Sequence, residues 1–200
     1  RSAGRSASVA GVFEYCGCRD IPLIGRLSEE HYEAVDALGA LRRAIDGGAE
    51  AEVRAALGGL AADLFPHNDS EEAGLFRELA KDEYFAPTVE ELIAQHRQFR
   101  ALVGRIEAGD WHAYHELEHT LRHHIDREEN GLFPATAVAV DGATWAEIDR
   151  LTHDFNHAHD REHGHSEAEL VAARRATATT ADQATPATQA TAGIPGGDEA

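Results

Sequence analysis

The sequence predicts an all-α protein: an antiparallel, up-down four-helix bundle with an additional C-terminal helix and a disordered tail. Three observations support this fold class. Ala and Leu dominate the apolar residues, which favours helices over strands. Apolar residues recur at the 3.6-residue period of a helix in several successive stretches. Glycine, proline and capping residues stand between these stretches.

The first two helices are bounded by capping and helix-breaking residues. Ser28 is expected to cap the first helix, which should end near Gly47-Gly48 because glycine terminates helices. The second helix should cover about residues 49–81. It is expected to be interrupted at Gly58-Gly59 and kinked at Pro66, whose ring removes a helical hydrogen bond.

The remaining helices are bounded in the same way. Pro87 suits the first turn of a third helix, and Gly109 is expected to end it. Asp110 should cap a fourth helix that runs to Pro134. A fifth, less apolar helix fits residues 144–163.

The chain is expected to form one folded domain between two flexible ends. Residues 1–20 are predicted to be a flexible leader that carries Cys16-Gly17-Cys18, and residues 21–165 the bundle. Residues 166–200 are rich in Ala and Thr and have too few large apolar side chains to fold, so they are predicted to be disordered.

Composition excludes several classes of partner and site. A formal net charge of −18 argues against nucleic acid, whose phosphates need a basic patch. No apolar run reaches the roughly 20 residues needed to span a bilayer, so no membrane partner is expected. Two cysteines are too few for a disulfide scaffold, and a reducing cytoplasm is the simplest compartment. No nucleotide fingerprint or Ser-His-Asp order is present.

The most informative feature is a ten-residue pattern, H-x-x-x-E-E-x-G-L-F, that occurs twice. It covers residues 67–76 and again residues 124–133. Residues four apart lie on the same face of a helix, so each copy presents an imidazole beside a carboxylate. Inward-facing pairs of this kind are how helical bundles hold two metal ions.

Helical periodicity places six such groups among core residues. His67 and Glu71 share one helix face with three leucines, and His124 and Glu128 do the same in the second copy. In the first and third helices, His31 and His96 lie on comparable apolar stripes. Because buried carboxylates cost several kcal/mol unless paired or bound to a metal, a metal centre is favoured over a purely structural bundle.

The ligand types narrow the choice of metal. Imidazole and carboxylate together suit iron, manganese or zinc. Four histidines and two bridging glutamates, shared between two ions, give each ion four protein ligands. An octahedral ion then keeps two places for solvent or a small molecule, which suits a pair of irons better than closed structural zinc.

These segments, with Glu30-His31 and Gln95-His96, resemble the hemerythrin-like HHE cation-binding domains over about residues 14–165. The leader segment at 14–18, Glu-Tyr-Cys-Gly-Cys, is similar to a small actinobacterial branch of that family. The resemblance implies a four-helix bundle with a non-haem centre of two Fe ions bridged by an oxo or hydroxo group. The matching ligands would be His31, His67, Glu71, His96, His124 and Glu128.

The chain departs from the oxygen-carrying hemerythrins at two places. Those proteins resemble one another in a H-x-x-x-H pair on the third helix, where this chain has Arg100. They also have H-x-x-x-x-D on the fourth helix, where this chain has His124 followed by Glu128. A missing histidine should open a coordination place. This favours reaction with peroxide, nitric oxide or O₂, or iron handling, over reversible O₂ carriage. The pattern is similar to HHE domains implicated in iron sensing and in nitrosative or oxidative stress. The resemblance implies a role in stress or iron homeostasis, with weak peroxidase- or catalase-like activity as the expected enzyme activity.

Several alternatives remain at this level. His123 competes with His124, although the repeat and the apolar stripe favour His124. Glu72 and Glu129 would be solvated or would orient a metal-bound imidazole. The cysteine pair could be free thiols, a redox pair or a soft-metal site. A non-catalytic iron- or oxygen-responsive sensor and a metal-free helical adaptor are the competing functions.

Overall fold

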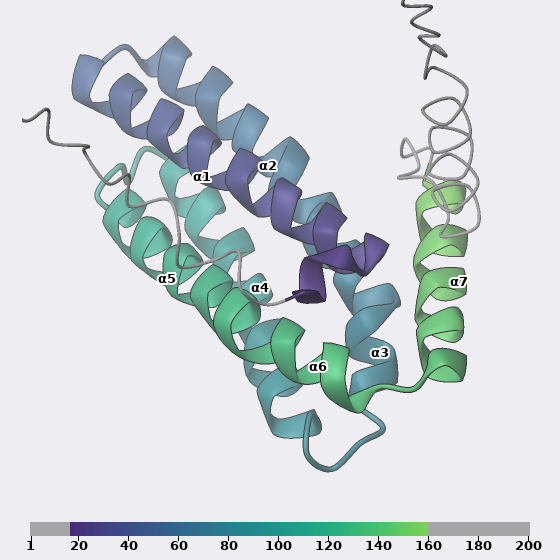
Figure 1. Cartoon of the computed structure of the whole chain (residues 1–200). Coiled ribbons are helices and arrows are strands. Elements are labelled where there is room, and N and C mark those ends of the chain that lie inside the picture. The colour runs from purple at the N-terminus through teal and green to yellow at the C-terminus, as the bar shows by residue number, and fades with distance from the viewer. Residues whose placement is uncertain (1–16, 160–200) are drawn as a thin grey trace, which may run out of the picture. The chain divides into compact units, whose positions relative to one another are not determined.

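The computed structural model describes residues 17–159, and no strand occurs among them (Figure 1). The leader up to Cys16, the last part of the predicted fifth helix and the predicted tail at 166–200 lie outside the described residues. The elements in chain order are η1 (Gly17–Asp20), α1 (Pro22–Gly47), α2 (Glu50–Ala73), α3 (Leu75–Leu79), α4 (Ala86–Glu107), α5 (Ala113–Arg127), η2 (Glu128–Leu132), α6 (Phe133–Ala139) and α7 (Gly142–Ala158).

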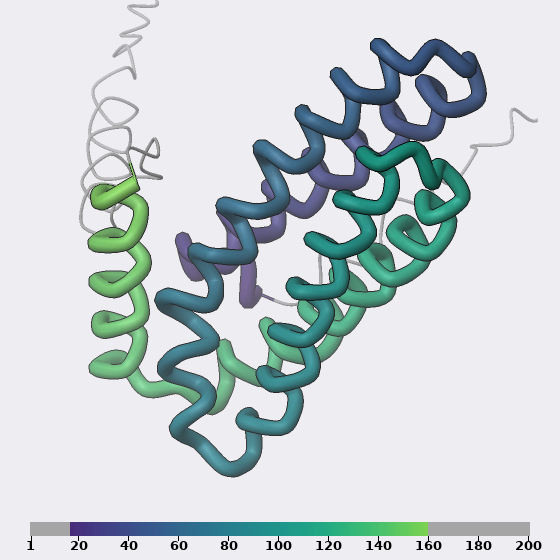
Figure 2. The backbone as a smooth tube through the Cα atoms, turned by 180° about the vertical axis from the view of Figure 1, so that it is seen from behind, coloured from purple at the N-terminus to yellow at the C-terminus, as the bar shows by residue number. Residues whose placement is uncertain are grey.

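Four long helices form the predicted antiparallel bundle. α1 and α2 make one helical hairpin, and α4 and α5 make the other (Figures 1 and 2). α1 packs against α2 and α5, and α4 packs against the same two helices. Gly48 ends α1 in a left-handed conformation with φ of 73°, which glycine adopts without steric cost. No helix in the described part of the chain is both long and apolar enough to cross a membrane.

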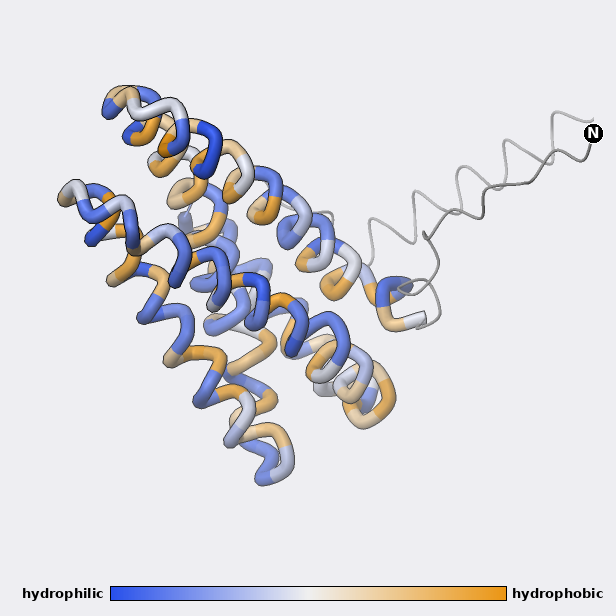
Figure 3. The backbone as a smooth tube through the Cα atoms, turned by 90° about the vertical axis from the view of Figure 1, so that its left-hand side faces the viewer, coloured by the Kyte–Doolittle hydropathy of each residue, from blue (hydrophilic) through white to orange (hydrophobic). Residues whose placement is uncertain are grey.

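The apolar core of the bundle has two parts, with polar residues between them. One part contains Leu38, Leu60, Leu64, Phe99 and Leu121, and the other contains Leu27, Leu75, Leu92, Leu132 and Phe133. On each long helix the polar positions of the candidate site fall between the residues of these two parts. Figure 3 shows hydrophobic and hydrophilic residues alternating along each helix. The site is therefore enclosed by apolar packing on both sides.

The first helix begins earlier than the sequence predicted. Pro22 occupies its first turn, where a missing backbone N–H costs nothing, and Ile21 precedes it in an extended conformation. Ser28 therefore does not cap the helix but lies inside it, buried. Before it, Gly17–Asp20 of the predicted leader form a short 3₁₀ helix in which Cys18 is buried.

The second helix breaks at a place that the sequence did not indicate. α2 continues through Gly58-Gly59 and Pro66 without interruption and ends before Gly74. A Cβ atom added to Gly74 would lie 1.9 Å from Oγ1 of Thr152 and 3.1 Å from the carbonyl oxygen of Ile148. Only glycine therefore allows α7 to pack so closely against α2 and α3.

The fourth predicted helix is divided into three parts. α5 begins at Ala113 rather than directly after Asp110, whose carboxylate accepts hydrogen bonds from Arg105 and also from the backbone N–H of Ala113. At Glu128 the backbone changes to a five-residue π-helical segment, and α6 continues the chain past Pro134. π-helical turns within α-helices are frequent at functional sites. Here the turn carries one of the predicted metal ligands.

Candidate metal centre

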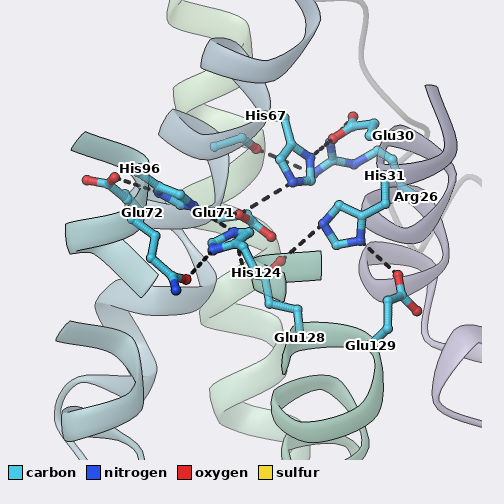
Figure 4. A network of polar contacts seen from close by, with 12 residues as sticks. Arg26, Glu30, His31, His67, Glu71, Glu72, His96, His124, Glu128 and Glu129 are labelled. Carbon is cyan, nitrogen blue, oxygen red and sulfur yellow. Dashed lines mark hydrogen bonds and ion pairs between the residues drawn. The ribbon is translucent and has the colours of Figure 1, made fainter. Parts of the chain in front are cut away.

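Six side chains from the four long helices and the π-helical segment converge inside the bundle (Figure 4). They are His31, His67, Glu71, His96, His124 and Glu128, and none is more than 4% exposed. They form two groups that could each hold a metal ion. The first site consists of His31, His67, Glu71 and Glu128, and the second site of Glu71, His96, His124 and Glu128. The two glutamates belong to both.

The carboxylates lie between the two sites. Oε2 of Glu71 is 3.5 Å from Nε2 of both His67 and His96. Glu128 directs Oε2 toward Nε2 of His31 at 3.1 Å and Oε1 toward Nε2 of His124 at 3.3 Å. Each glutamate can therefore bridge one ion at the first site and one at the second.

Most of the facing atoms are close together without being hydrogen-bonded; the exception is the 3.1 Å contact between Nε2 of His96 and Nε2 of His124. Within residues 17–159, Nε2 of His31 and of His67 and all four carboxylate oxygens of Glu71 and Glu128 form no hydrogen bond. A buried polar atom without a partner costs free energy, so a cluster of six needs a compensating group. Atoms that point at a shared centre rather than at each other fit metal ligands.

The opposite nitrogen of each imidazole is held by a hydrogen bond. Nδ1 of His31 donates to Glu129 at 2.8 Å, and Nδ1 of His96 donates to Glu72 at 2.8 Å. These two glutamates, which the sequence left as either solvated or supporting, thus contact the imidazoles. Because Nδ1 carries the proton, Nε2 is left as the atom that can bind a metal.

Two further partners were missed by sequence reasoning. Nδ1 of His67 donates to Glu30 at 2.7 Å, and Nδ1 of His124 donates to the side-chain oxygen of Gln95 at 2.9 Å. The sequence feature that could have identified them is their position: Glu30 directly precedes His31, and Gln95 directly precedes His96. Arg26 in turn pairs with Glu30, and Arg19 pairs with Glu129, so two of the supporting carboxylates have a cation behind them.

An approximate two-fold relation connects the two halves of the centre. The rings of His31 and His67 have centroids 4.8 Å apart, and those of His96 and His124 are also 4.8 Å apart. Phe133 stacks on the first histidine of one pair at 5.8 Å. Phe76, from the other copy of the repeat, stacks on the first histidine of the other pair at 5.6 Å. The repeated sequence is thus also a repeated geometry.

Burial and nearby charges shift the pKa values of the histidines in opposite directions. Burial alone lowers the pKa of His31, but the nearby carboxylate of Glu128 and the hydrogen bond to Glu129 outweigh it and raise this pKa to about 9. For His67, burial outweighs the hydrogen bond to Glu30 and lowers the pKa to about 4. One imidazole of the first site therefore favours the charged form and the other the neutral form.

The pKa values of the two central glutamates are also shifted in opposite directions. Burial, together with the negative charge of Glu128, raises the pKa of Glu71 well above its usual range. Burial acts in the same direction on Glu128, but the close imidazoles of His124 and His31 outweigh it and hold the pKa of Glu128 well below its usual range. Without metal, protons must compensate the buried charges, and a cation can replace those protons.

Residues 23–136 match the sequence model of the Hemerythrin HHE cation binding domain. The chain belongs to this family. The match spans α1 to α6 and therefore includes all six residues of the two sites. No curated protein and no solved structure matches the chain. The family assignment agrees with the bundle and with the two His/Glu groups, which could hold cations.

Two doubtful positions of this hemerythrin HHE domain are now placed. His123 is exposed and His124 is buried at the second site. Arg100 follows His96 by one turn but does not face the centre. Its side chain is 42% exposed, forms an ion pair with Asp69 and lies over the ring of Phe65 at 4.4 Å. The sequence suggested an open coordination place where Arg100 replaces a histidine. The Arg100 side chain lies away from the centre, so its position does not support that expectation.

A cavity of about 260 Å³ reaches the first site of the hemerythrin HHE domain from outside. It lies between α1 and the α5–η2 region, and His31 is part of its wall. Its other lining residues are Arg19, Ser28, Tyr32, Val35, Arg122, Ile125, Asp126, Glu129 and Asn130. The cavity is large enough for a molecule of a few atoms and brings it to the imidazole of one candidate ligand.

Proposed function

We propose that this hemerythrin HHE domain binds two iron ions and reacts with a small oxidant or gas: peroxide, nitric oxide or O₂. The observation that carries the proposal is the pair of His₂Glu₂ groups sharing Glu71 and Glu128. His31 and His67 would hold one iron, and His96 and His124 the other. Iron in this setting supplies redox chemistry and places for exogenous ligands.

The protein side chains have distinct tasks in this proposal. The four imidazoles bind through Nε2, and their Nδ1 protons stay on the hydrogen bonds to Glu30, Glu129, Glu72 and Gln95. With four protein ligands, an octahedral iron at either site would keep two places that the chain does not fill. Apolar packing on both sides limits access of water, and the cavity beside His31 offers a route for a small molecule.

A non-catalytic iron- or oxygen-responsive sensor is the second candidate. Arg19, in the 3₁₀ helix that precedes the bundle, pairs with Glu129 at 2.9 Å, and Glu129 holds His31. A change in the ligands of the first iron would therefore reach the segment that joins the leader to the bundle. In this reading, binding would change the position of the leader without turnover.

The test combines metal analysis with reactivity. Protein purified from iron-rich medium should contain two irons per chain and absorb in the near ultraviolet, as coupled ferric pairs do. One metal per fully loaded chain, or zinc alone after iron supplementation, would overturn the proposal.

The diferrous protein is then exposed in turn to O₂, H₂O₂ and NO while its spectrum is followed. Reaction with H₂O₂ or NO is expected, and catalytic consumption favours the enzyme over the sensor. A stable and fully reversible O₂ adduct, without peroxide or NO chemistry, would place this protein among oxygen carriers. The Glu71→Ala variant, which should lack the coupled pair, is the control for reactions of loosely bound iron.

A further inference from the structure

The four groups that accept the imidazole Nδ1 protons follow the two-fold relation, except that one of them differs in chemical type. In the first site, both Nδ1 atoms donate to carboxylates, those of Glu129 and Glu30. In the second site, one Nδ1 donates to the Glu72 carboxylate, but that of His124 donates to the neutral amide of Gln95. Glu30 and Gln95 hold equivalent positions, each directly before the first histidine of its hairpin. The asymmetry is therefore a single exchange of carboxylate for amide.

We propose that the two metal sites differ in affinity, and that the second site binds its ion more weakly because Gln95 stands where the first site has Glu30. This inference rests on the proposed two-ion centre. The two-fold relation pairs the six ligands one to one, so the ligand types give no reason for a difference in metal affinity. The hydrogen bonds that hold the Nδ1 atoms of the histidines do give such a reason.

The chemical reason lies in what a carboxylate does to the imidazole. A carboxylate that accepts the Nδ1 proton draws it away from the ring and makes Nε2 a stronger donor to a cation. An amide oxygen has no net charge and cannot take up the proton, so it holds the ring in place but increases its basicity less. Loss of such an outer partner typically costs about 10–100-fold in metal affinity.

Two other features of the surroundings bear on the comparison. The Glu72 side chain behind His96 is 37% exposed, against 10% for Glu129 and 23% for Glu30, so water screens its charge more. This weakens the second site further. Arg19 and Arg26 act in the opposite direction, because they offset part of the charge on the first site's carboxylates. Both arginines act through the carboxylate that contacts the ring, so they reduce the difference without reversing it.

The experiment is a titration of the metal-free protein with Co²⁺, followed by calorimetry and visible absorption. The wild-type chain should bind two ions in two steps that differ by at least about tenfold in affinity. Gln95→Glu should strengthen the weaker step, so that the two steps merge at high affinity. Glu30→Gln should weaken the stronger step, so that they merge at low affinity. The two substitutions should therefore change metal affinity in opposite directions. A general loss of folded structure would lower the affinity in both variants.

A charge-matched control separates the hydrogen bond from the added charge. Gln98→Glu introduces the same charge on the same helix, at an exposed side chain that bonds Glu116 instead of an imidazole. Gln98→Glu should leave the affinities of the two metal-binding steps as different as in the wild-type chain. The order of filling is read with one equivalent of Zn²⁺, which should shift the imidazole NMR signals of His31 and His67 before those of the second site.

The outcomes distinguish this inference from the proposed function. Equal affinities in the wild type, no response to Gln95→Glu, or earlier filling of the second site would overturn the inference while leaving a two-ion centre intact. Failure to bind two ions at all would overturn the proposed function itself. Circular dichroism of each metal-free variant confirms that the compared proteins are folded.

Discussion

The Nε2 atoms of His96 and His124 lie 3.1 Å apart. Two imidazoles bound at right angles to one octahedral ion, each at about 2.1 Å, would have their nitrogens about 3.0 Å apart. Tetrahedral angles would separate them by about 3.4 Å at the same bond length. The spacing therefore suits two nitrogens that bind one ion as neighbouring ligands, as the grouping of these histidines with Glu71 and Glu128 also indicates.

The first prediction separates the bridging glutamates from their neighbours in sequence. Glu71→Ala or Glu128→Ala should abolish the coupled metal pair, because each carboxylate reaches histidines of both sites. Glu72→Ala or Glu129→Ala should lower affinity by about 10–100-fold but leave two ions bound at saturating metal. Metal analysis and the near-ultraviolet spectrum give the comparison. Equal losses from all four changes would mean that the wrong carboxylates were chosen.

The second prediction concerns stability. The metal-free bundle keeps six ionisable groups in its interior, and metal that binds only the folded form should raise the melting temperature. At a free metal concentration about 100 times Kd, the gain of about 2.7 kcal/mol corresponds to about 5–10 °C. Calorimetry with and without metal measures it. A chain ended after Arg175 should show the same gain, and an unchanged melting curve would favour the metal-free adaptor.

The third prediction revises the expectation for Arg100. Because its guanidinium pairs with Asp69 at the surface, Arg100→His should place an imidazole outside the centre, with no new ligand. The metal content and iron spectrum should stay unchanged, and loss of the exposed ion pair should cost at most about 1 kcal/mol. A shifted spectrum with an added nitrogen ligand would show that this helix face can turn inward.

The fourth prediction uses the two glycines of the repeat as a matched pair. Gly74→Ala should destabilise the protein by about 1–3 kcal/mol, because the new methyl group meets Thr152 and the backbone of α7. Gly131→Ala, at the equivalent position, should change stability little, since its added Cβ would meet no atom within 4 Å beyond the adjacent residues and the backbone of its own helical turn. Denaturant unfolding of both variants tests this. Thr152→Ala should recover part of the loss at Gly74, and equal effects at both glycines would contradict the account.

The sequence predicted the bundle and the position of the six site residues because both depend on helix faces. The 3.6-residue period fixes which residues share a face, and this was enough to choose His124 over His123. It also indicated the ends of α1 and α4, where Gly48 and Gly109 adopt positive φ.

What the sequence missed depends on contacts between helices. Glu30 and Gln95 bond histidines of neighbouring helices, and the period of one helix says nothing about its neighbours. The break at Gly74 follows from the close approach of α7. The outward position of Arg100 likewise depends on a neighbouring helix, because its half-exposed side chain pairs with Asp69.

The shared glutamates have a mechanical consequence for the two hairpins. The α1–α2 hairpin provides three groups of the first site, and Glu128 from the other half provides the fourth. At the second site the α4–α5 half provides three groups, and Glu71 from the α1–α2 hairpin provides the fourth. An ion bound at either site would therefore act as a cross-link between the halves of the bundle. We expect the hairpins to separate freely only after both ions have left, so metal loss and opening of the bundle should proceed as one cooperative event.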